Sequence, residues 1–335
     1  MNGSPSSQGF PTLLQRFFLD RLLNQQNVSK QTVAAYRDTF RLLLNYLQIH
    51  RSLVPSALSL GDLNAETVLG FLEYLEQQRG NSIRTRNARL AAIRSFLHYA
   101  GSYDPPSLAT IQRVLAIPMK RFELPAVVFL SQEEITALLK ASDLTTWSGR
   151  RDQALFTTLY NTGARVSEII GARISDLVLD SAASLNLHGK GRKERAIPLW
   201  KSTVQCLKHW LNENTADAHR PLFPDARGLQ LSRSGVEYRL RLAKQSASES
   251  CPSLAAKRIS PHILRHTTAM HLLQSGVDLT VIALWLGHES PATTHWYMEA
   301  DLAMKEAALA RLQEPPLSPS RYRPSDKLIQ FLETL

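Results

Sequence analysis

The chain of 335 residues contains little cysteine and no long apolar run. Its two cysteines, Cys206 and Cys251, are too few for a disulfide framework, which favours a reducing compartment such as the cytosol. Its apolar stretches, such as Leu124–Leu130, are far shorter than the roughly 20 residues that span a bilayer. The N-terminal stretch MNGSPSSQGFP lacks the basic start and apolar core of a signal peptide. We therefore expect neither secretion nor a membrane span.

Acidic residues are also few relative to basic ones. The 29 Asp and Glu residues face 39 Lys and Arg residues, which gives a formal net charge of +10. Such an excess suits a polyanionic partner, either nucleic acid or an anionic membrane surface. The excess divides evenly between residues 1–115 and 116–335, so folded surfaces in both halves should carry it. With no membrane segment in the sequence, nucleic acid is the favoured partner.

Two further signatures are missing from the sequence. No cluster of Asp and Glu suggests a two-metal site, and no G-x-x-x-x-G-K-[ST] loop suggests nucleotide binding. We therefore predict that the protein uses no metal and no other cofactor.

The N-terminal half has the spacing of amphipathic helices. Residues 1–9 are polar and are predicted to be disordered, whereas apolar residues from Pro11 to about Ala100 recur every three or four positions. Ser29 can cap a second helix, and further helices are expected over Asn64–Gln78 and Ser82–Tyr99. We predict a compact four-helix domain over residues 10–115.

A proline-rich stretch separates this domain from the rest of the chain. Pro118 and Pro125 lie in residues 116–130, which we interpret as a linker that also carries Lys120 and Arg121. Ser131 with Glu134 three positions later has the pattern of a helix capping box.

The second domain is predicted over residues 131–313. It is mostly helical, except that Leu185–Leu199 has the pattern strand, glycine-flanked turn, strand. A helix is expected over Asp301–Leu312, followed by a proline-rich extension, residues 314–335, that ends in an apolar patch at Leu328–Leu335. The fold class is therefore mainly α with a small β-hairpin.

Four separated segments carry residues suited to phosphate chemistry. They are Asn161–Glu168, the hairpin around Lys190, Ser260–His266, and Leu286–His288 followed by Tyr297. Taken singly, each has an ordinary explanation: a paired surface arginine, a solvated loop lysine, a structural histidine or a core tyrosine. Glu168 in particular is expected to be structural, bonding the main chain or a neighbouring side chain.

Taken in order, the segments resemble the tyrosine recombinase family, above all its Xer-type and integrase-type members. T-G-x-R-x-S-E corresponds to Thr162–Glu168, and G-K-G-x-K-x-R to Gly189–Arg195. H-x-x-R-H corresponds to His262–His266, and the ending T-T-x-x-Y to Thr293–Tyr297. The resemblance extends from about residue 10 to residue 312. It implies an N-terminal core-binding (SAM-like) domain and an integrase-type catalytic domain.

The resemblance also implies a role for each residue in DNA cleavage and rejoining. Tyr297 would be the nucleophile that forms a 3′-phosphotyrosine, and Arg165 and Arg265 would bind the non-bridging phosphate oxygens. Lys190 would protonate the leaving 5′ oxygen. His262 would act as general base or hydrogen-bond partner of the tyrosine, and His288 would bond the scissile phosphate. The covalent intermediate conserves the phosphodiester bond energy, so rejoining needs no ATP.

Basic residues of the N-terminal domain are candidates for DNA backbone contacts. We predict such contacts for Arg84, Arg86 and Arg89, together with Lys120 and Arg121 of the linker. The alternative is that some of these side chains simply solvate a helix surface.

Partners and biological role follow from the same resemblance. We expect a double-stranded recombination site bound by a tetramer of this chain or of sister recombinases, located in the bacterial cytoplasm and associated with the nucleoid. Integration and excision of a mobile element is the favoured role, with Xer-type chromosome dimer resolution as the alternative. A type IB topoisomerase and a catalytically inactive DNA-binding regulator of the same fold are the rival interpretations.

Overall fold

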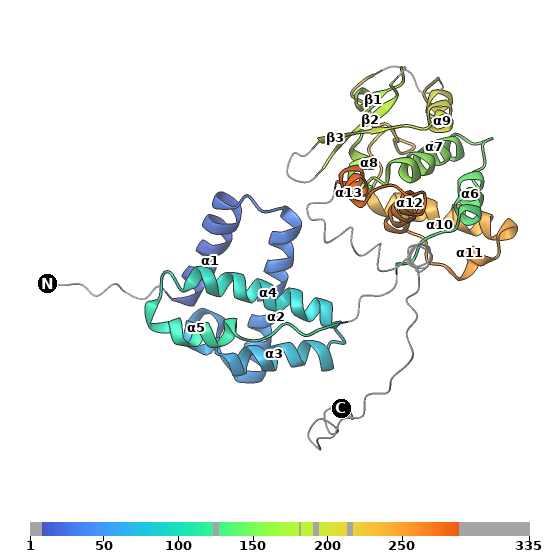
Figure 1. Ribbon diagram of the computed structural model, residues 1–335. Coiled ribbons are helices and arrows are strands. Elements are labelled where there is room, and N and C mark those ends of the chain that lie inside the picture. The colour runs from blue at the N-terminus through green and yellow to red at the C-terminus, as the bar shows by residue number, and fades with distance from the viewer. Residues whose placement is uncertain (1–8, 123–126, 181, 190–193, 213–216, 288–335) are drawn as a thin grey trace, which may run out of the picture. The chain divides into compact units, whose positions relative to one another are not determined.

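The computed structural model describes residues 9–122, 127–180, 182–189, 194–212 and 217–287. The predictions for Lys190, His288 and Tyr297, for the Asp301–Leu312 helix and for the 314–335 extension lie outside the described residues. The chain divides into two compact units, Met1–Pro125 and Ala126–Leu335 (Figure 1). Each unit is described by itself.

Unit 1 is built from amphipathic helices whose starts are set by side-chain caps. Ser29, Asn64 and Ser82 each accept a hydrogen bond from the main-chain N–H three residues later, which stabilises the first turn of the helix that follows. The helices are α1 (Phe10–Arg16), which continues as the π-helix η1 (Phe17–Gln25), α2 (Lys30–Arg51), α3 (Ala65–Gln77), α4 (Ile83–Ala100) and α5 (Leu108–Leu115).

The fifth helix, α5, corrects the prediction of a four-helix unit. Pro105 and Pro106 occupy a short 3₁₀ turn, and the helix begins just after it at Leu108. Proline is tolerated in the first turn of a helix, so Pro105 and Pro106 can precede α5 without preventing its formation. Ile111 and Val114 of α5 are buried in the core of unit 1.

Unit 2 surrounds its core with helices and a small sheet. The capping box expected at Ser131 and Glu134 is present at the start of the first helix. The helices are α6 (Gln132–Lys140), α7 (Trp147–Thr162), α8 (Val166–Gly171), α9 (Lys201–Asn212), α10 (Arg233–Ser250), α11 (Ser253–Ala256), α12 (Pro261–Gln274) and α13 (Leu279–Leu286).

The predicted hairpin is confirmed and gains a third strand. Strands β1 (Leu177–Val178), β2 (Ser184–His188) and β3 (Glu194–Pro198) form an antiparallel sheet in the order β1-β2-β3. Leu185 pairs with Ile197 and Leu187 with Arg195, so these four side chains lie on one face. The three apolar members are buried, which places Arg195 on the core-facing side of the sheet.

The two ends of the stretch predicted as a linker are held by different units. Asn87 of α4 donates to the main-chain oxygen of Lys120 at 2.8 Å. Leu130 is fully buried in unit 2 and donates its N–H to the Thr267 hydroxyl at 3.0 Å. Within the described ranges, no helix is long and apolar enough to cross a membrane.

Candidate active site

Arg165 lies two residues after the glycine that ends helix α7. Helix α7 stops at Gly163, whose φ of +60° lies in the left-handed region that glycine adopts without strain. Arg165 then occupies the N-cap position of α8. Its guanidinium donates to Glu168 Oε1 at 2.9 Å and to the main-chain oxygen of Gly287 at 3.0 Å. With 40% of its side chain exposed, Arg165 presents a fixed positive charge to solvent.

Glu168 organises the charges around it. Its carboxylate accepts from the main-chain N–H and the guanidinium of Arg165, and from two nitrogens of Arg195 at 3.1 and 2.7 Å. Burial of Glu168 opposes its ionisation, but the hydrogen bonds from Arg195 and Arg165 outweigh burial and hold its pKa below the usual value. The expectation that Glu168 has a structural role agrees with these bonds.

Arg265 and His262 lie one turn apart on α12, whose first turn is capped by Ser260 and preorganised by Pro261. Arg265 is 4% exposed, and its guanidinium donates to the main-chain oxygens of Gly163 at 2.7 Å and Leu286 at 2.8 Å. The buried charge is thus held against two carbonyl groups.

His262 is the more exposed of these two side chains, and its ring packs edge-to-face on that of His266 with centroids 4.1 Å apart. Partial desolvation lowers the pKa of His262, and the positive charges of Arg265, Arg233 and Arg165 lower it further. A histidine in this environment is neutral over most of the physiological pH range, as a proton acceptor must be.

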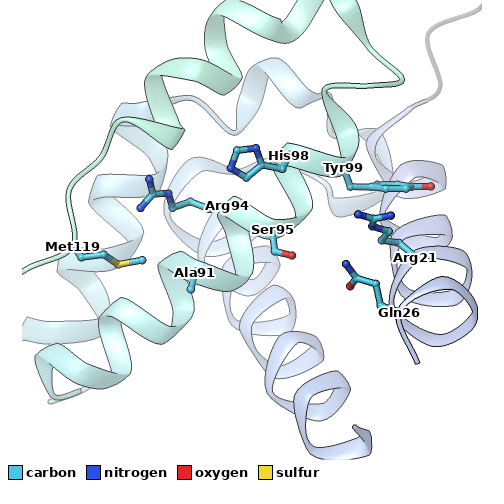
Figure 2. A pocket seen from close by; sticks show the side chains of 8 residues that line it. All are labelled: Arg21, Gln26, Ala91, Arg94, Ser95, His98, Tyr99 and Met119. Atoms are coloured by element: carbon cyan, nitrogen blue, oxygen red, sulfur yellow. The ribbon is translucent and has the colours of Figure 1, made fainter. Parts of the chain in front are cut away.

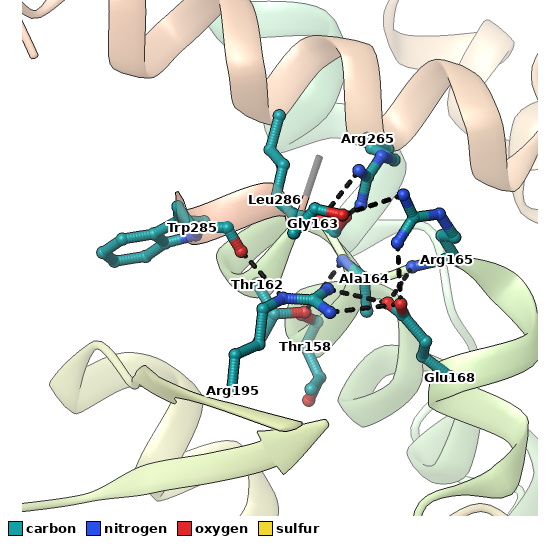
Figure 3. Close-up of polar contacts among 11 residues, drawn as sticks. Thr158, Thr162, Gly163, Ala164, Arg165, Glu168, Arg195, Arg265, Trp285 and Leu286 are labelled. Carbon is teal, nitrogen blue, oxygen red and sulfur yellow. Dashed lines mark hydrogen bonds and ion pairs between the residues drawn. The ribbon is translucent and has the colours of Figure 1, made fainter. Parts of the chain in front are cut away.

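The C-terminal end of α13 gathers three arginines from distant parts of the chain (Figure 3). Arg195 donates to the oxygen of Trp285 at 2.9 Å, Arg265 to that of Leu286, and Arg165 to that of Gly287. The last carbonyls of a helix lack intrahelical partners and carry its partial negative charge, so they attract cations. His288 is the next residue along the chain. The structure therefore brings Arg165, Glu168 and Arg265 together beside the point where the segment with His288 and Tyr297 begins.

Two glycines allow this close packing. A Cβ on Gly163 would lie 2.5 Å from Leu286 Cδ2, and a Cβ on Gly287 would lie 2.9 Å from an Arg195 nitrogen. Gly287 also has a positive φ, of +64°. A Cβ at Gly163 would displace the side chain of Leu286, and a Cβ at Gly287 would displace that of Arg195.

The motif G-K-G-x-K-x-R ends at Arg195, but nothing in the sequence assigned Arg195 a role in the site or indicated the carbonyls of α13. A signal for Arg195 was present, because it lies two positions before Ile197 and so shares the buried face of its strand. A charge on a buried face needs a partner, which points to the site. No sequence pattern indicates which carbonyls a buried guanidinium will meet.

The predicted DNA contacts of unit 1 fall into two groups. Arg84 and Arg121 are exposed, and Lys120 is half-exposed while paired with Glu76 at 2.6 Å. Arg84 lies over the ring of Phe122, 5.5 Å from its centre. These three cations remain available to a phosphate backbone.

Arg86 is buried, which corrects the prediction that it contacts the DNA backbone. It is 3% exposed, and its guanidinium donates to the main-chain oxygen of Pro118 at 3.2 Å, so it holds the 118–120 segment onto α4. Burial lowers the pKa of Arg86. Arg89 is half-buried and donates to the oxygen of Ala35 and the hydroxyl of Thr39, which ties α4 to α2. Counting positions along a helix does not reveal that a neighbouring segment covers these side chains.

A basic hollow of about 410 Å³ lies on the exposed side of α4 (Figure 2). Its lining residues are Arg21, Gln26, Ala91, Arg94, Ser95, His98, Tyr99 and Met119. Small side chains at Ala91 and Ser95 leave the helix surface open, while Arg21 and Arg94 supply positive charge. This hollow adds Arg21, Arg94 and His98 to the candidate DNA-facing residues.

Comparison with known protein families identifies the family to which the chain belongs. Residues 128–304 match the model of the phage integrase family, and residues 15–102 match the phage integrase N-terminal SAM-like domain. The chain belongs to the phage integrase family of tyrosine recombinases. This family consists of site-specific DNA recombinases, so the resemblance inferred from the ordered motifs is confirmed.

Similar proteins of this recombinase family cover nearly the whole chain. The integrase/recombinase y4rC of Sinorhizobium fredii is 50% identical over 96% of this chain and 97% of its own length. The tyrosine recombinase XerD of Listeria monocytogenes is 34% identical over 84% of this chain and 91% of its own.

Solved structures show the same fold at lower identity. The Tn1549 transposon integrase in complex with a circular intermediate DNA is 16% identical, with a TM-score of 0.67 over 90% of this chain and 99% of that one. The XerH recombinase bound to palindromic difH substrate is 20% identical, with a TM-score of 0.65 over 92% and 91%. The predicted fold class, a helical SAM-like domain followed by an integrase-type catalytic domain, is confirmed.

Proposed function

We propose that this recombinase integrates and excises a mobile element by cleaving and rejoining DNA through a 3′-phosphotyrosine. The observation that carries the proposal is the meeting of Arg165, Glu168 and Arg265 at the end of α13, directly before His288. The 50% identity to an integrase/recombinase over almost the full length of both chains favours the mobile-element role.

The geometry supports specific roles in the cleavage step. Arg165 would bind a non-bridging oxygen of the scissile phosphate from the exposed side of the site. Arg265, at 4% exposure, would bind the other oxygen only when the phosphate enters as deep as the Gly163 and Leu286 carbonyls. Two fixed guanidiniums would then stabilise the charge of the phosphorane-like transition state, which metal ions do in many other nucleases.

Proton transfer would involve residues on both sides of the phosphate. His262, with its lowered pKa, would accept the proton of the Tyr297 hydroxyl as its oxygen attacks phosphorus. Lys190 would give a proton to the departing 5′ oxygen, and His288 would bond the phosphate. We propose these three roles from the family's motifs, and the described geometry of His262 is compatible with its part.

DNA binding would use the exposed cations of unit 1. Arg84, Lys120 and Arg121, with the hollow that contains Arg21 and Arg94, would contact the phosphate backbone. One structural neighbour is a lambda integrase tetramer bound to a Holliday junction. We infer that this recombinase likewise works as a tetramer on two duplexes, in the bacterial cytoplasm and on the nucleoid.

Xer-type resolution of chromosome dimers is the second candidate function. It is favoured by the 34% identity to XerD over 84% of this chain. The two functions differ in their DNA sites: an element's ends for integration, and one chromosomal site for dimer resolution. Sequencing recombination junctions in strains with and without the gene would distinguish the two functions, because the junctions that depend on the gene reveal its DNA site.

Covalent attachment to DNA tests the shared chemistry. We expect the protein to form an adduct with a nicked duplex that carries its recombination site. Cleavage beside the nick releases a short strand with a free 5′ hydroxyl. Because this strand diffuses away, the covalent intermediate cannot be rejoined and accumulates. Tyr297→Phe should bind the same duplex and form no adduct. Tyr238→Phe removes a hydroxyl from an exposed tyrosine of the same unit and serves as the control. An adduct formed by Tyr297→Phe would show that another residue is the nucleophile.

A further inference from the structure

Arg195 contacts two parts of the candidate site, the Glu168 carboxylate and the end of α13. It leaves β3 on the core-facing side, with 13% of its side chain exposed. A charge placed there loses most of its hydration, so it must be compensated by ionic or hydrogen-bonding partners. Three of its bonds involve parts of the candidate site: two to Glu168, and one to the oxygen of Trp285.

The two bonds to Glu168 control where Arg165 lies. Each Glu168 oxygen accepts one hydrogen bond from Arg165 and one from Arg195. The Arg195 fork therefore fixes the carboxylate in the plane and position from which it holds the Arg165 guanidinium. Without that fork, the carboxylate of Glu168 would keep only its bonds to the main-chain N–H and the guanidinium of Arg165, and would hold Arg165 less firmly.

The third bond joins the same residue to the end of α13. Trp285 is two residues before Gly287, whose oxygen accepts from Arg165. Arg195 thus reaches both anchors of Arg165, the carboxylate on one side and the helix end on the other (Figure 3).

We propose that Arg195 is a positioning residue for recombination, which holds Glu168 and the end of α13 so that the Arg165 guanidinium meets the scissile phosphate. The inference rests on the proposed function, in which Arg165 binds that phosphate. Arg195 itself acts through Arg165 and touches no reacting atom.

Single-turnover cleavage of a nicked duplex tests the proposal. Arg195→Ala and Arg195→Lys should each slow adduct formation by on the order of 10²-fold, the usual cost of misplacing a catalytic group by about 1 Å. Affinity for DNA should stay close to wild type. Arg195→Lys keeps a charge beside the buried Glu168 and should unfold near the wild-type temperature, whereas Arg195→Ala should unfold at a lower temperature, because Glu168 loses a partner, and yet remain folded in the assay. Lysine should fail to restore the rate, because a single ammonium cannot replace a planar fork. Arg227→Ala, at an exposed arginine of the same unit, is the matched control.

A double-mutant cycle separates action through Arg165 from an independent effect. In an Arg165→Ala background, replacing Arg195 should cause little further loss of rate. Full additivity of the two losses would overturn the proposal, and so would restoration of the rate by lysine. A variant that loses folding or DNA binding together with cleavage would assign Arg195 to the scaffold and also overturn it. If wild-type protein forms no adduct, the proposed function fails; if wild type reacts and the Arg195 variants react equally fast, only this inference fails.

Discussion

The guanidinium of Arg265 donates a hydrogen bond of 2.7 Å to the main-chain oxygen of Gly163, a residue 102 positions earlier in the chain. The bond joins α12 to the turn that precedes Arg165. The two arginines proposed to bind the phosphate are therefore positioned by the same short stretch of main chain, and a change in one should be felt at the other.

Arg265→Lys tests the value of this geometry. Lysine keeps the charge but offers one ammonium where Arg265 uses separate nitrogens for Gly163 and Leu286. We expect the cleavage rate to fall on the order of 10²–10³-fold, as for loss of a donor to a transition-state oxyanion. DNA affinity, measured by fluorescence anisotropy, should change little. A loss of affinity that accounts for the whole loss of rate would contradict the clamp role.

Gly163→Ala should destabilise the protein more than an equivalent glycine change elsewhere. Both Gly163 and Gly276 have a positive φ, so alanine at either costs roughly 1–2 kcal/mol of backbone strain. At Gly163 the new Cβ also meets Leu286 at 2.5 Å, whereas nothing lies within 4 Å at Gly276. Overpacking should add about 1–3 kcal/mol. Denaturant unfolding measures the loss of stability in each variant. Equal losses for Gly163→Ala and Gly276→Ala would show that Leu286 moves aside at little energetic cost.

Glu168→Gln should change how stability depends on pH. The pKa of Glu168 is lowered in the folded state, so its contribution is complete above the unfolded value of about 4.3 and is lost as pH falls through the folded pKa. The variant should be less stable than wild type at pH 7 by roughly 3 kcal/mol, as expected when a buried ion pair loses one partner. The difference in stability between Glu168→Gln and wild type should become smaller below pH 4.

The control for this measurement is Glu66→Gln. Glu66 pairs with Arg51 on the surface of unit 1, with 80% of its side chain exposed. Exposed pairs contribute little, so this variant should follow the wild-type curve. A constant gap between Glu168→Gln and wild type from pH 7 to pH 3 would show that the Glu168 charge does not contribute.

Lys190→Ala should be rescued by a substrate whose 5′ leaving oxygen is replaced by sulfur. A thiolate departs without a proton, so a general acid becomes dispensable. On the ordinary substrate the same variant should cleave slowly. Slow cleavage of both substrates would assign Lys190 to a phosphate or base contact.

Local signals in the sequence predicted much of the fold. Ser29, Ser82 and Ser131 cap the helices that the spacing of apolar residues indicated, because a capping bond depends on residues only three positions apart. Helix α5 was missed because Pro105 and Pro106 precede it closely, and proline usually interrupts a helical pattern. The third strand, β1, has two residues and is too short to give an alternating pattern.

The candidate site was predictable in its residue types but not in its contacts. Arg165 and Arg265 were recognised from ordered motifs that the family shares. Arg86 was misassigned because its burial depends on the 118–120 segment, which returns across α4 from a different part of the chain. Contacts of this kind depend on tertiary packing, which residue spacing does not encode.

The gathering of arginines at α13 also has a cost for the free protein. Arg165, Arg195 and Arg265 bring three positive charges to three successive carbonyls, while Glu168 supplies one negative charge among them. Like charges held close together repel, and a bound phosphate relieves that repulsion. Selection for DNA cleavage therefore opposes selection for a stable free monomer at this place. Replacing one of these arginines by a neutral residue would relieve part of that repulsion, whereas neutralising Glu168 would add to it.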